Sequence, residues 1–339
     1  MLKQKTISKI FPIVLILSVI MFFGFSFFRG KSIVQKSEKE INPSQVQVES
    51  NAKEYVLREI DSKSGLVRWD LSAKESSTEN GLQSAIINDI KAHVYRGKEI
   101  AFELSAPHAK ANSLTKEIYL FGNVTTKDQS GEFILMSKQI SLGMGTSIEA
   151  QNGFNLYLKN NGTVIGESAL INDDHSKITV TDLKEALFND IKLSGKTVYI
   201  EKDKSSGISI ATITNGGTIV LKNNDTLTAN SIKWKKSGEI EASTNVVYSS
   251  GDKLFKAELL TITTDKKVFA KGHVSIKHGD TECYGDSLNY GNDSIITITG
   301  RPKAVQGDKE ILADKILYDL NLRKVQATGN VRTLVNQKA

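Results

Sequence analysis

The stretch "VFAKGHVSIKHG" at residues 268–279 decides the fold, because its apolar and polar residues alternate with a period of two. Side chains two residues apart lie on the same face of an extended strand. One face of this stretch carries an apolar row with a glycine in line: Val268, Ala270, Gly272, Val274 and Ile276. The alternation predicts a strand with one face in a protein core.

The same phrase recurs along the chain at a regular interval. It returns as "IYLFGNVTTK" (118–127), "VQATGNVRTL" (325–334) and, more loosely, "IEASTNVVYS" (240–249). In the second half, the glycine-like position falls at residues 216, 244, 272, 300 and 329, at intervals of 28, 28, 28 and 29 residues. Gly122 and Gly153 extend the series upstream with wider spacing between residues 153 and 216. A period this regular is typical of stacked supersecondary units.

Each unit contains two extended halves. In the unit around residue 272, a strand over about 254–263 precedes the turn "TDKK", and a second strand follows over about 268–277. The most helix-like stretch beyond residue 40, "DLKEALFND" (182–190), is short and has alternating flanks. Pro302, within "IITITGRP", predicts an edge, bulge or bend. We therefore expect an all-β fold built from antiparallel two-strand repeats of about 28 residues.

The glycine in each phrase has two interpretations. It can allow close packing or a bulge at a corner of the sheet. Alternatively, small side chains at one level can keep two facing sheets, normally about 10 Å apart, from filling the space between them. The second interpretation predicts an apolar trough that is open along one side. The residue pattern alone leaves both open.

Five of the six net positive charges come from the first 40 residues. Seven of the 44 Lys and Arg residues lie there, against two of the 38 acidic residues, which leaves 37 basic and 36 acidic residues elsewhere. The rest of the chain is nearly neutral, so the charge gives no case for nucleic-acid binding. The single cysteine, Cys283, excludes an intramolecular disulfide and is typical of a small buried apolar side chain.

An uncharged apolar segment, "IFPIVLILSVIMFFGFSFF", covers residues 10–28. A helix of this length spans roughly 28 Å, close to the hydrocarbon thickness of a bilayer. A cleavable signal peptide is the alternative, but the run is long for one and ends in Phe27, Phe28 and Arg29 without small residues. We expect a retained anchor, with the large C-terminal remainder on the exported side. Basic residues flank the segment on both sides, so they do not decide its orientation.

Several motifs follow one another behind this segment: W-x-L-x-A at Trp69, Leu71 and Ala73, the strand "NDIKAHVY" (88–95), Ala106 with Ala109, and "LFGNV" at 120–124. Their order resembles the LptC family of the lipopolysaccharide export system. From about residue 200, two-strand units such as "ILADKILYDLNLRKVQATGNV" resemble the OstA-like repeat of LptA-type proteins. Together the resemblance covers most of residues 40–335.

The resemblance implies a β-jellyroll, also called a β-taco, whose apolar interior holds lipid acyl chains. It implies a single-pass inner-membrane protein with its β body in the periplasm, bound to an ABC transporter of the LptB, LptF and LptG type. It further implies an LptA-type bridge protein as a partner, joined edge to edge by strand pairing. No cofactor and no catalytic residue belong to this part of the family.

This chain departs from the family in length, since a simple LptC-like protein would end near residue 200. We expect a tail (1–9), an anchor (10–28), a polar tether (29–51), an LptC-like β domain (52–200) and OstA-like repeats (201–339). The extra repeats leave open whether a separate LptA-type partner is needed. They also leave open whether the body is one column or two hinged ones.

Two sets of residues are the candidate sites. The groove is expected to be lined by inward residues of three phrases: Trp69, Leu71, Ile118, Leu120, Val124, Val268, Val274 and Ile276. The partner-binding edge is expected in a terminal strand over about 324–335, with the row Val325, Ala327, Gly329 and Val331.

The leading hypothesis is a membrane-anchored bridge that accepts lipopolysaccharide from the transporter and passes it along the apolar groove towards the outer membrane. The rival hypothesis is a structural stalk with a filled core and no lipid. An anchored enzyme is a third, without a catalytic cluster to support it. The five histidines are scattered, and His273 and His278, five residues apart, fall on opposite faces of one strand, so no metal site is expected. A filled interior would favour the stalk.

Overall fold

The computed structural model describes residues 51–335 apart from 80–83, 113–116, 144, 160–161, 189, 204–206 and 292–293. The predicted anchor at 10–28 lies outside the described residues, as does the predicted tether except for its last residue. Within the described part, no helix has the length and apolar character of a membrane span. Residues 49–339 form one compact unit, which is described here by itself.

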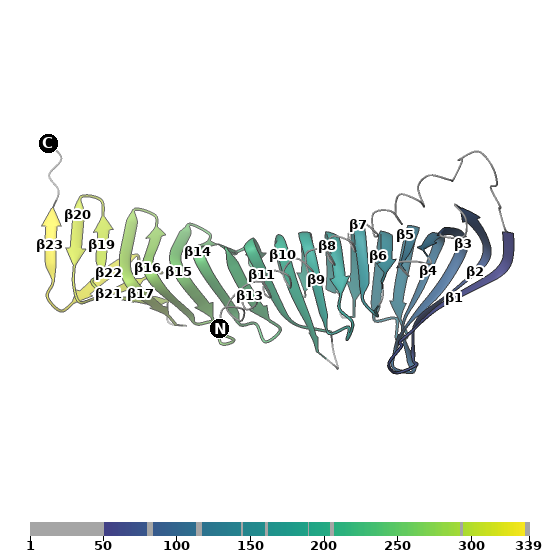
Figure 1. The fold of residues 1–339 in the computed structure, drawn as a ribbon. Coiled ribbons are helices and arrows are strands. Elements are labelled where there is room, and N and C mark those ends of the chain that lie inside the picture. Colours follow the sequence, from purple (N-terminus) through teal and green to yellow (C-terminus); the bar gives the residue numbers. More distant parts are fainter. Residues whose placement is uncertain are drawn as a thin grey trace, which may run out of the picture. The chain divides into compact units, whose positions relative to one another are not determined.

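The described residues form strands throughout, which confirms the all-β prediction (Figure 1). The first half contains β1 (Asn51–Ile60), β2 (Val67–Glu79), β3 (Ser84–Arg96), β4 (Glu99–Asn112), β5 (Glu117–Asp128), β6 (Phe133–Leu142), β7 (Ile148–Leu158), β8 (Gly162–Ile171), β9 (Lys177–Phe188), β10 (Ile191–Asp203) and β11 (Gly207–Val220). The second half contains β12 (Thr226–Ala229), β13 (Ser231–Lys235), β14 (Ile240–Ser250), β15 (Lys253–Ile262), β16 (Val268–His278), β17 (Thr281–Tyr290), β18 (Ile295–Thr299), β19 (Lys303–Gln306), β20 (Lys309–Leu312), β21 (Lys315–Asp319), β22 (Lys324–Thr328) and β23 (Arg332–Val335).

Each strand from β1 to β11 pairs antiparallel with the next. The predicted unit around residue 272 is confirmed as the hairpin of β15 and β16. The predicted domain boundary at 200/201 falls inside β10, which pairs with β11 from Lys192 to Asp203. Strand pairing is therefore continuous there, and a division into two domains stays a prediction.

Most strands bend near their middle, and the bend divides the sheet into two layers. The register of β16 against β17 shifts between Lys271 and Val274, at the glycine of the phrase. Towards the C-terminus the halves become separate strands, because β17 pairs with β18 through one half and with β19 through the other. We call layer 1 the half that contains β12, β19, β20 and β23, and layer 2 the half that contains β13, β18, β21 and β22. Figure 1 shows β19, β20 and β23 in one layer and β21 and β22 in the other.

The repeated glycines mark these corners. Gly272 and the following His273 both have positive φ, 78° and 46°, a conformation that glycine adopts without steric cost. A Cβ atom on Gly272 would lie 2.8 Å from the Cβ of the exposed Glu258, so the glycine does not face the interior. The corner interpretation is therefore correct, and the placement of Gly272 in the inward row is wrong. Pro302 occupies the corner between β18 and β19, as its bend prediction expects.

Two glycine corners differ in a way that separates backbone strain from crowding. We expect Gly153→Ala, with φ 92° and open space around its Cβ, to lower the free energy of unfolding by about 1 kcal/mol. Gly272→Ala also brings the new Cβ to 2.8 Å from the Glu258 Cβ, so it should lower the free energy of unfolding by about 1 kcal/mol more than Gly153→Ala does. Urea denaturation of the two variants measures the difference. Equal losses would show that the Glu258 side chain moves away freely.

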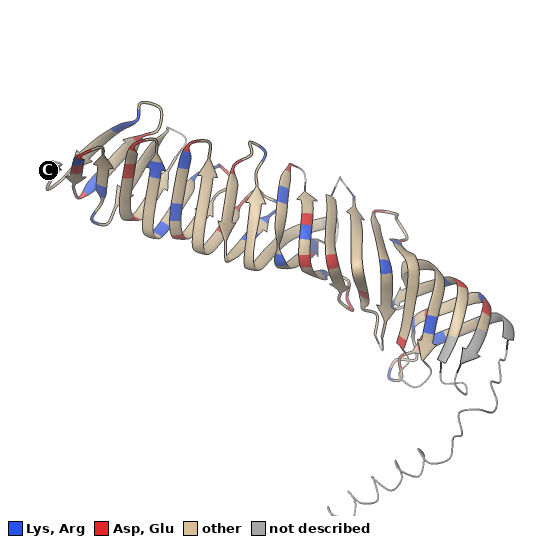
Figure 2. Ribbon diagram, turned by 90° about the horizontal axis from the view of Figure 1, so that it is seen from above, with Lys and Arg blue, Asp and Glu red and all other residues tan. Residues whose placement is uncertain are grey.

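The core lies between the two layers. Buried and exposed residues alternate in β16 as predicted: Val268, Ala270, Val274 and Ile276 are buried, while Phe269, Lys271 and Lys277 are exposed. The outer faces carry both signs of charge along the strands (Figure 2), in keeping with the near-neutral body. Cys283 is buried as predicted, and burial raises the pKa of its thiol to about 12.

Candidate functional site

The eight predicted groove residues all lie in the interior between the layers. Trp69 and Leu71 come from β2, three more from β5 and three from β16. Six of them pack into one apolar cluster, and Val274 and Ile276 belong to a second cluster nearer the C-terminus. The structure thus brings the phrases to one interior. Lipid binding by these residues stays a prediction.

This interior is filled in the described part of the chain. None of the eight residues is more than 9% exposed, and Leu71, Ile118, Leu120 and Val124 are fully buried. An occupant of the interior therefore needs the layers to separate. A filled interior is what the stalk hypothesis expects. Lipid carriage is possible only where the two layers can separate, so the line along which their strand ends meet is the candidate functional site.

We call that line the seam: the ends of the strands in layer 1 meet the ends of the strands in layer 2 along it. At the β2 end, the Trp69 Nε1–H donates across the seam to the carbonyl of Gly143, at 3.1 Å. Gly143 begins the turn after β6, and its partner is 74 residues away in the sequence. The indole N–H therefore ties the two layers together beside the core.

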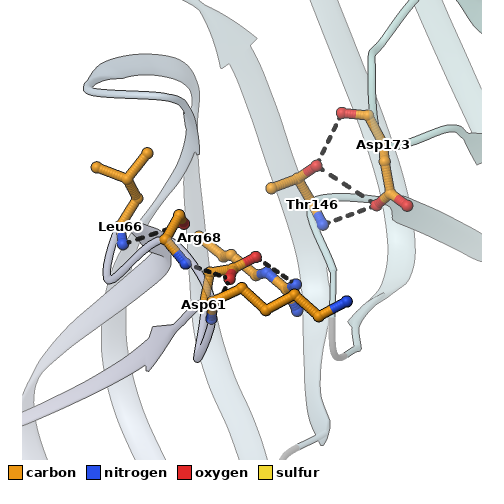
Figure 3. A network of polar contacts seen from close by, with 7 residues as sticks. Asp61, Leu66, Arg68, Thr146 and Asp173 are labelled. Atoms are coloured by element: carbon orange, nitrogen blue, oxygen red, sulfur yellow. Dashed lines mark hydrogen bonds and ion pairs between the residues drawn. The ribbon is translucent and has the colours of Figure 1, made fainter.

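A polar pocket of about 310 Å³ lies on the seam near this contact. Layer 1 lines it with Asp61, in the turn after β1, and Arg68, at the start of β2, whose carboxylate and guanidinium are 2.7 Å apart. Layer 2 lines it with Thr146, whose backbone N–H donates to Asp173 at 2.8 Å (Figure 3). The backbone N–H groups of Ser64 and Lys63, together with the Arg68 guanidinium, hold the pKa of Asp61 well below its usual range. The pocket keeps its shape because the donors and acceptors on both walls are paired.

His175 closes the seam next to this pocket. Its Nε2 lies 3.0 Å from the Thr146 carbonyl, which can only accept, so Nε2 carries the hydrogen and Nδ1 is the acceptor. The Arg96 guanidinium, at the end of β3 in layer 1, donates to that Nδ1 at 3.3 Å. Desolvation lowers the pKa of His175, with Arg96 and Lys202 adding to the effect, so the ring is neutral near pH 7.

Two phenylalanines form the floor below His175. The Phe102 ring lies 4.8 Å from the His175 ring and 5.2 Å from the Phe133 ring, measured between centroids. The Lys202 ammonium, from the end of β10 in layer 2, lies 4.9 Å from the centroid of Phe133. Burial lowers the pKa of Lys202. Cationic groups from both layers thus meet above an aromatic part of the core.

Further along, an aromatic contact closes the seam. Phe188 at the end of β9 and Trp234 at the end of β13 stack with centroids 5.6 Å apart. The buried Trp234 Nε1–H has no hydrogen-bond acceptor, which is costly in an apolar interior. The stack is therefore held by apolar and ring contact alone.

The C-terminal part of the seam is closed by polar contacts. The buried Tyr318 hydroxyl in layer 2 lies 2.9 Å from Nδ1 of the buried His278 in layer 1. Outside this pair, the Arg323 guanidinium of layer 2 lies 2.9 Å from the Asp252 carboxylate of layer 1. The seam is thus closed by separable side-chain contacts at each of these points, whereas on the opposite side the backbone itself passes from one layer to the other at the corners.

The predicted partner-binding edge is divided between two strands. The row expected in a single strand over 324–335 is split by the corner at Gly329, so β22 ends layer 2 and β23 ends layer 1. Val325 and Ala327 in β22 pack against the second apolar cluster, and Val331 before β23 is 49% exposed. Within the described residues, β22 pairs only with β21 and β23 only with β20, so each leaves a free edge. Strand pairing with a partner stays a prediction.

The seam residues Arg96, His175 and Lys202 were not anticipated from the sequence. Arg96 and His175 are 79 residues apart and sit at a strand end and in a turn. Their meeting depends on the bend of every strand between them, which no local pattern reports. Among the described residues, no group of three or more His, Cys, Asp and Glu side chains is placed to hold a metal ion.

The N-terminal part of the chain matches a family of known proteins. Residues 12–148 match the family described as lipopolysaccharide-assembly, LptC-related. No curated protein matches the sequence. The crystal structure of LptH, the LptA-homologous periplasmic component of the lipopolysaccharide transport device of Pseudomonas aeruginosa, is 15% identical, with a TM-score of 0.17. The match covers 51% of this chain and 93% of the LptH chain. The resemblance to LptC-related proteins is confirmed over residues 12–148.

Proposed function

We propose that this chain, whose residues 12–148 match the LptC-related lipopolysaccharide-assembly family, carries lipopolysaccharide with its acyl chains between the two β layers. The observation that supports carriage is the two-layered interior, which is apolar along the described stack and closed along one side only by separable contacts. No covalent chemistry is needed for this function.

The physical case is that apolar contacts within the protein can be exchanged for apolar contacts with the lipid. Moving an acyl chain through water exposes apolar surface at about 0.8 kcal/mol per CH₂ group. An acyl chain inserted between the layers would replace apolar contacts between protein side chains with apolar contacts to the lipid. Such contacts are non-directional, so the exchange costs little. The main cost is the loss of the seam contacts. Opening at the seam therefore reconciles a filled resting interior with lipid carriage.

The finer elements of the proposal follow the family. The segment at 10–28 would anchor the chain in the inner membrane, beside an ABC transporter of the LptB, LptF and LptG type that delivers the lipid. The β body would lie in the periplasm. The free edges of β22 and β23 would pair with an LptA-type protein that takes the lipid towards the outer membrane.

A structural stalk is the second candidate, and the filled interior favours it. The stalk would space or display a partner and would never open. The two functions differ in whether any lipid is held by the protein.

Lipid that co-purifies with the full chain tests the proposal. After extraction from cells in mild detergent, mass spectrometry should find an acylated glycolipid in near-stoichiometric amount with the protein. An unrelated single-pass protein purified in parallel from the same cells gives the background. Glycolipid at background level would overturn carriage and support the stalk.

A further inference from the structure

The seam carries a cluster of basic side chains without carboxylate partners. Among the residues that the structure describes, Arg96 and Lys202 form no direct ion pair, whereas Lys177, Lys184 and Lys192 each pair with a glutamate. The printed polar contact of Arg96 is a single hydrogen bond to the neutral His175, and Lys202 faces the Phe133 ring. Both cations therefore keep N–H donors that no carboxylate accepts directly.

The nearby carboxylates are engaged elsewhere. Asp128 accepts from Ser130 Oγ at 2.7 Å and from the Phe133 backbone N–H at 3.1 Å. Asp173 accepts from the Thr146 N–H at 2.8 Å. These two acids balance the charge of the cluster at longer range, and Asp174 adds a weaker contribution next to His175. An incoming anion would be held by the open donors of Arg96 and Lys202, not by a net positive field.

The position of the cluster favours an amphipathic ligand. Below it, Phe102 and Phe133 belong to the apolar interior, and beside it Arg96 is exposed to solvent. The planar guanidinium fork and the ammonium point charge are the two side-chain groups that bind phosphate most readily. An anionic head group held here would leave attached acyl chains next to the aromatic floor.

We propose that Arg96, His175 and Lys202 form a binding site for a phosphate monoester at the seam. The inference rests on the proposed function only for the source of the phosphate, which would be the phosphorylated sugar of the carried glycolipid. Binding there draws Arg96 towards the anion and away from His175 Nδ1, so head-group binding weakens one of the contacts that closes the seam.

The site is tested on the full chain with glucose 1-phosphate as the probe and glucose as the uncharged control. NMR titration of the His175 ring should show its pKa rising by at least about half a unit with glucose 1-phosphate, because a nearby anion favours imidazolium. Glucose should leave it unchanged. Arg96→Gln and Lys202→Gln should each weaken binding at least about fivefold, and Lys202→Arg, which keeps the charge, should retain it.

Lys177→Gln is the matched control, because Lys177 is exposed and lies 3.9 Å from Glu201. Its binding should equal that of the unchanged protein. A pKa of His175 that does not move, or equal binding by the Arg96, Lys202 and Lys177 variants, would overturn the site.

The source of the phosphate is separated by a second arm. Intact lipopolysaccharide should bind more tightly than the same material after phosphatase treatment, and Arg96→Gln should remove the difference. Glucose 1-phosphate binding without any lipid binding would uphold a free-phosphate site and contradict carriage. Lipid binding that is indifferent to its phosphates would uphold carriage and overturn the assignment of the site to the lipid.

Discussion

A covalent bridge between positions 252 and 323 should stop lipopolysaccharide from entering the interior. Asp252 and Arg323 face each other across the seam at 2.9 Å, and their side chains are 53% and 55% exposed. Such an exposed ion pair contributes at most about 1 kcal/mol, so it opens readily. A short bismaleimide joining Asp252→Cys to Arg323→Cys cannot open. Cys283 does not compete for the reagent, because it is buried and burial raises its thiol pKa to about 12.

The control joins two positions within one layer. Asp190 and Lys222 form an exposed ion pair at 2.8 Å between neighbouring turns of layer 1. Asp190→Cys bridged to Lys222→Cys should load fluorescent lipopolysaccharide as fast as the unbridged protein, whereas the seam bridge should remove most of the loading. Normal loading through a bridged seam would show that lipid enters at the ends of the stack.

Leu120→Ala should lower the free energy of unfolding by about 3 kcal/mol, since a fully buried leucine leaves a cavity when truncated. The neighbouring Phe121 faces outwards, is 38% exposed and contacts the His108 ring. Phe121→Ala should cost about 1 kcal/mol or less, despite the larger side chain removed. Urea unfolding followed by tryptophan fluorescence gives both values. Equal losses would contradict the assignment of inner and outer faces.

The face of each strand was predictable from sequence because alternation leaves only two choices once a strand is recognised. Val274 and Ile276 are buried, and Lys277 is exposed, as the period of two requires. Of the corners between residues 153 and 216, the one in β9 was missed for a physical reason. Asp182 has φ 50° there, so an aspartate takes the conformation that glycine marks elsewhere.

The seam could not be predicted in the same way. Its contacts join the ends of strands that lie far apart in sequence, as Trp69 and Gly143 do. Their meeting depends on how sharply every strand bends at its corner, and on side-chain lengths across the gap. The terminal strand was likewise expected to be single, because the phrase continues through Gly329 without showing that the chain changes layers there.

The most direct test of lipid carriage is photo-crosslinking in cells at Val274, with Leu120 as a second interior probe and Ser275 as the outward control. A photoreactive phenylalanine analogue replaces each residue in turn in the full-length chain. The account predicts that lipopolysaccharide is captured at 274 and 120 and not at 275, because alternate side chains face the interior. Capture at none of the three positions by a folded protein, or equal capture at 274 and 275, would contradict it.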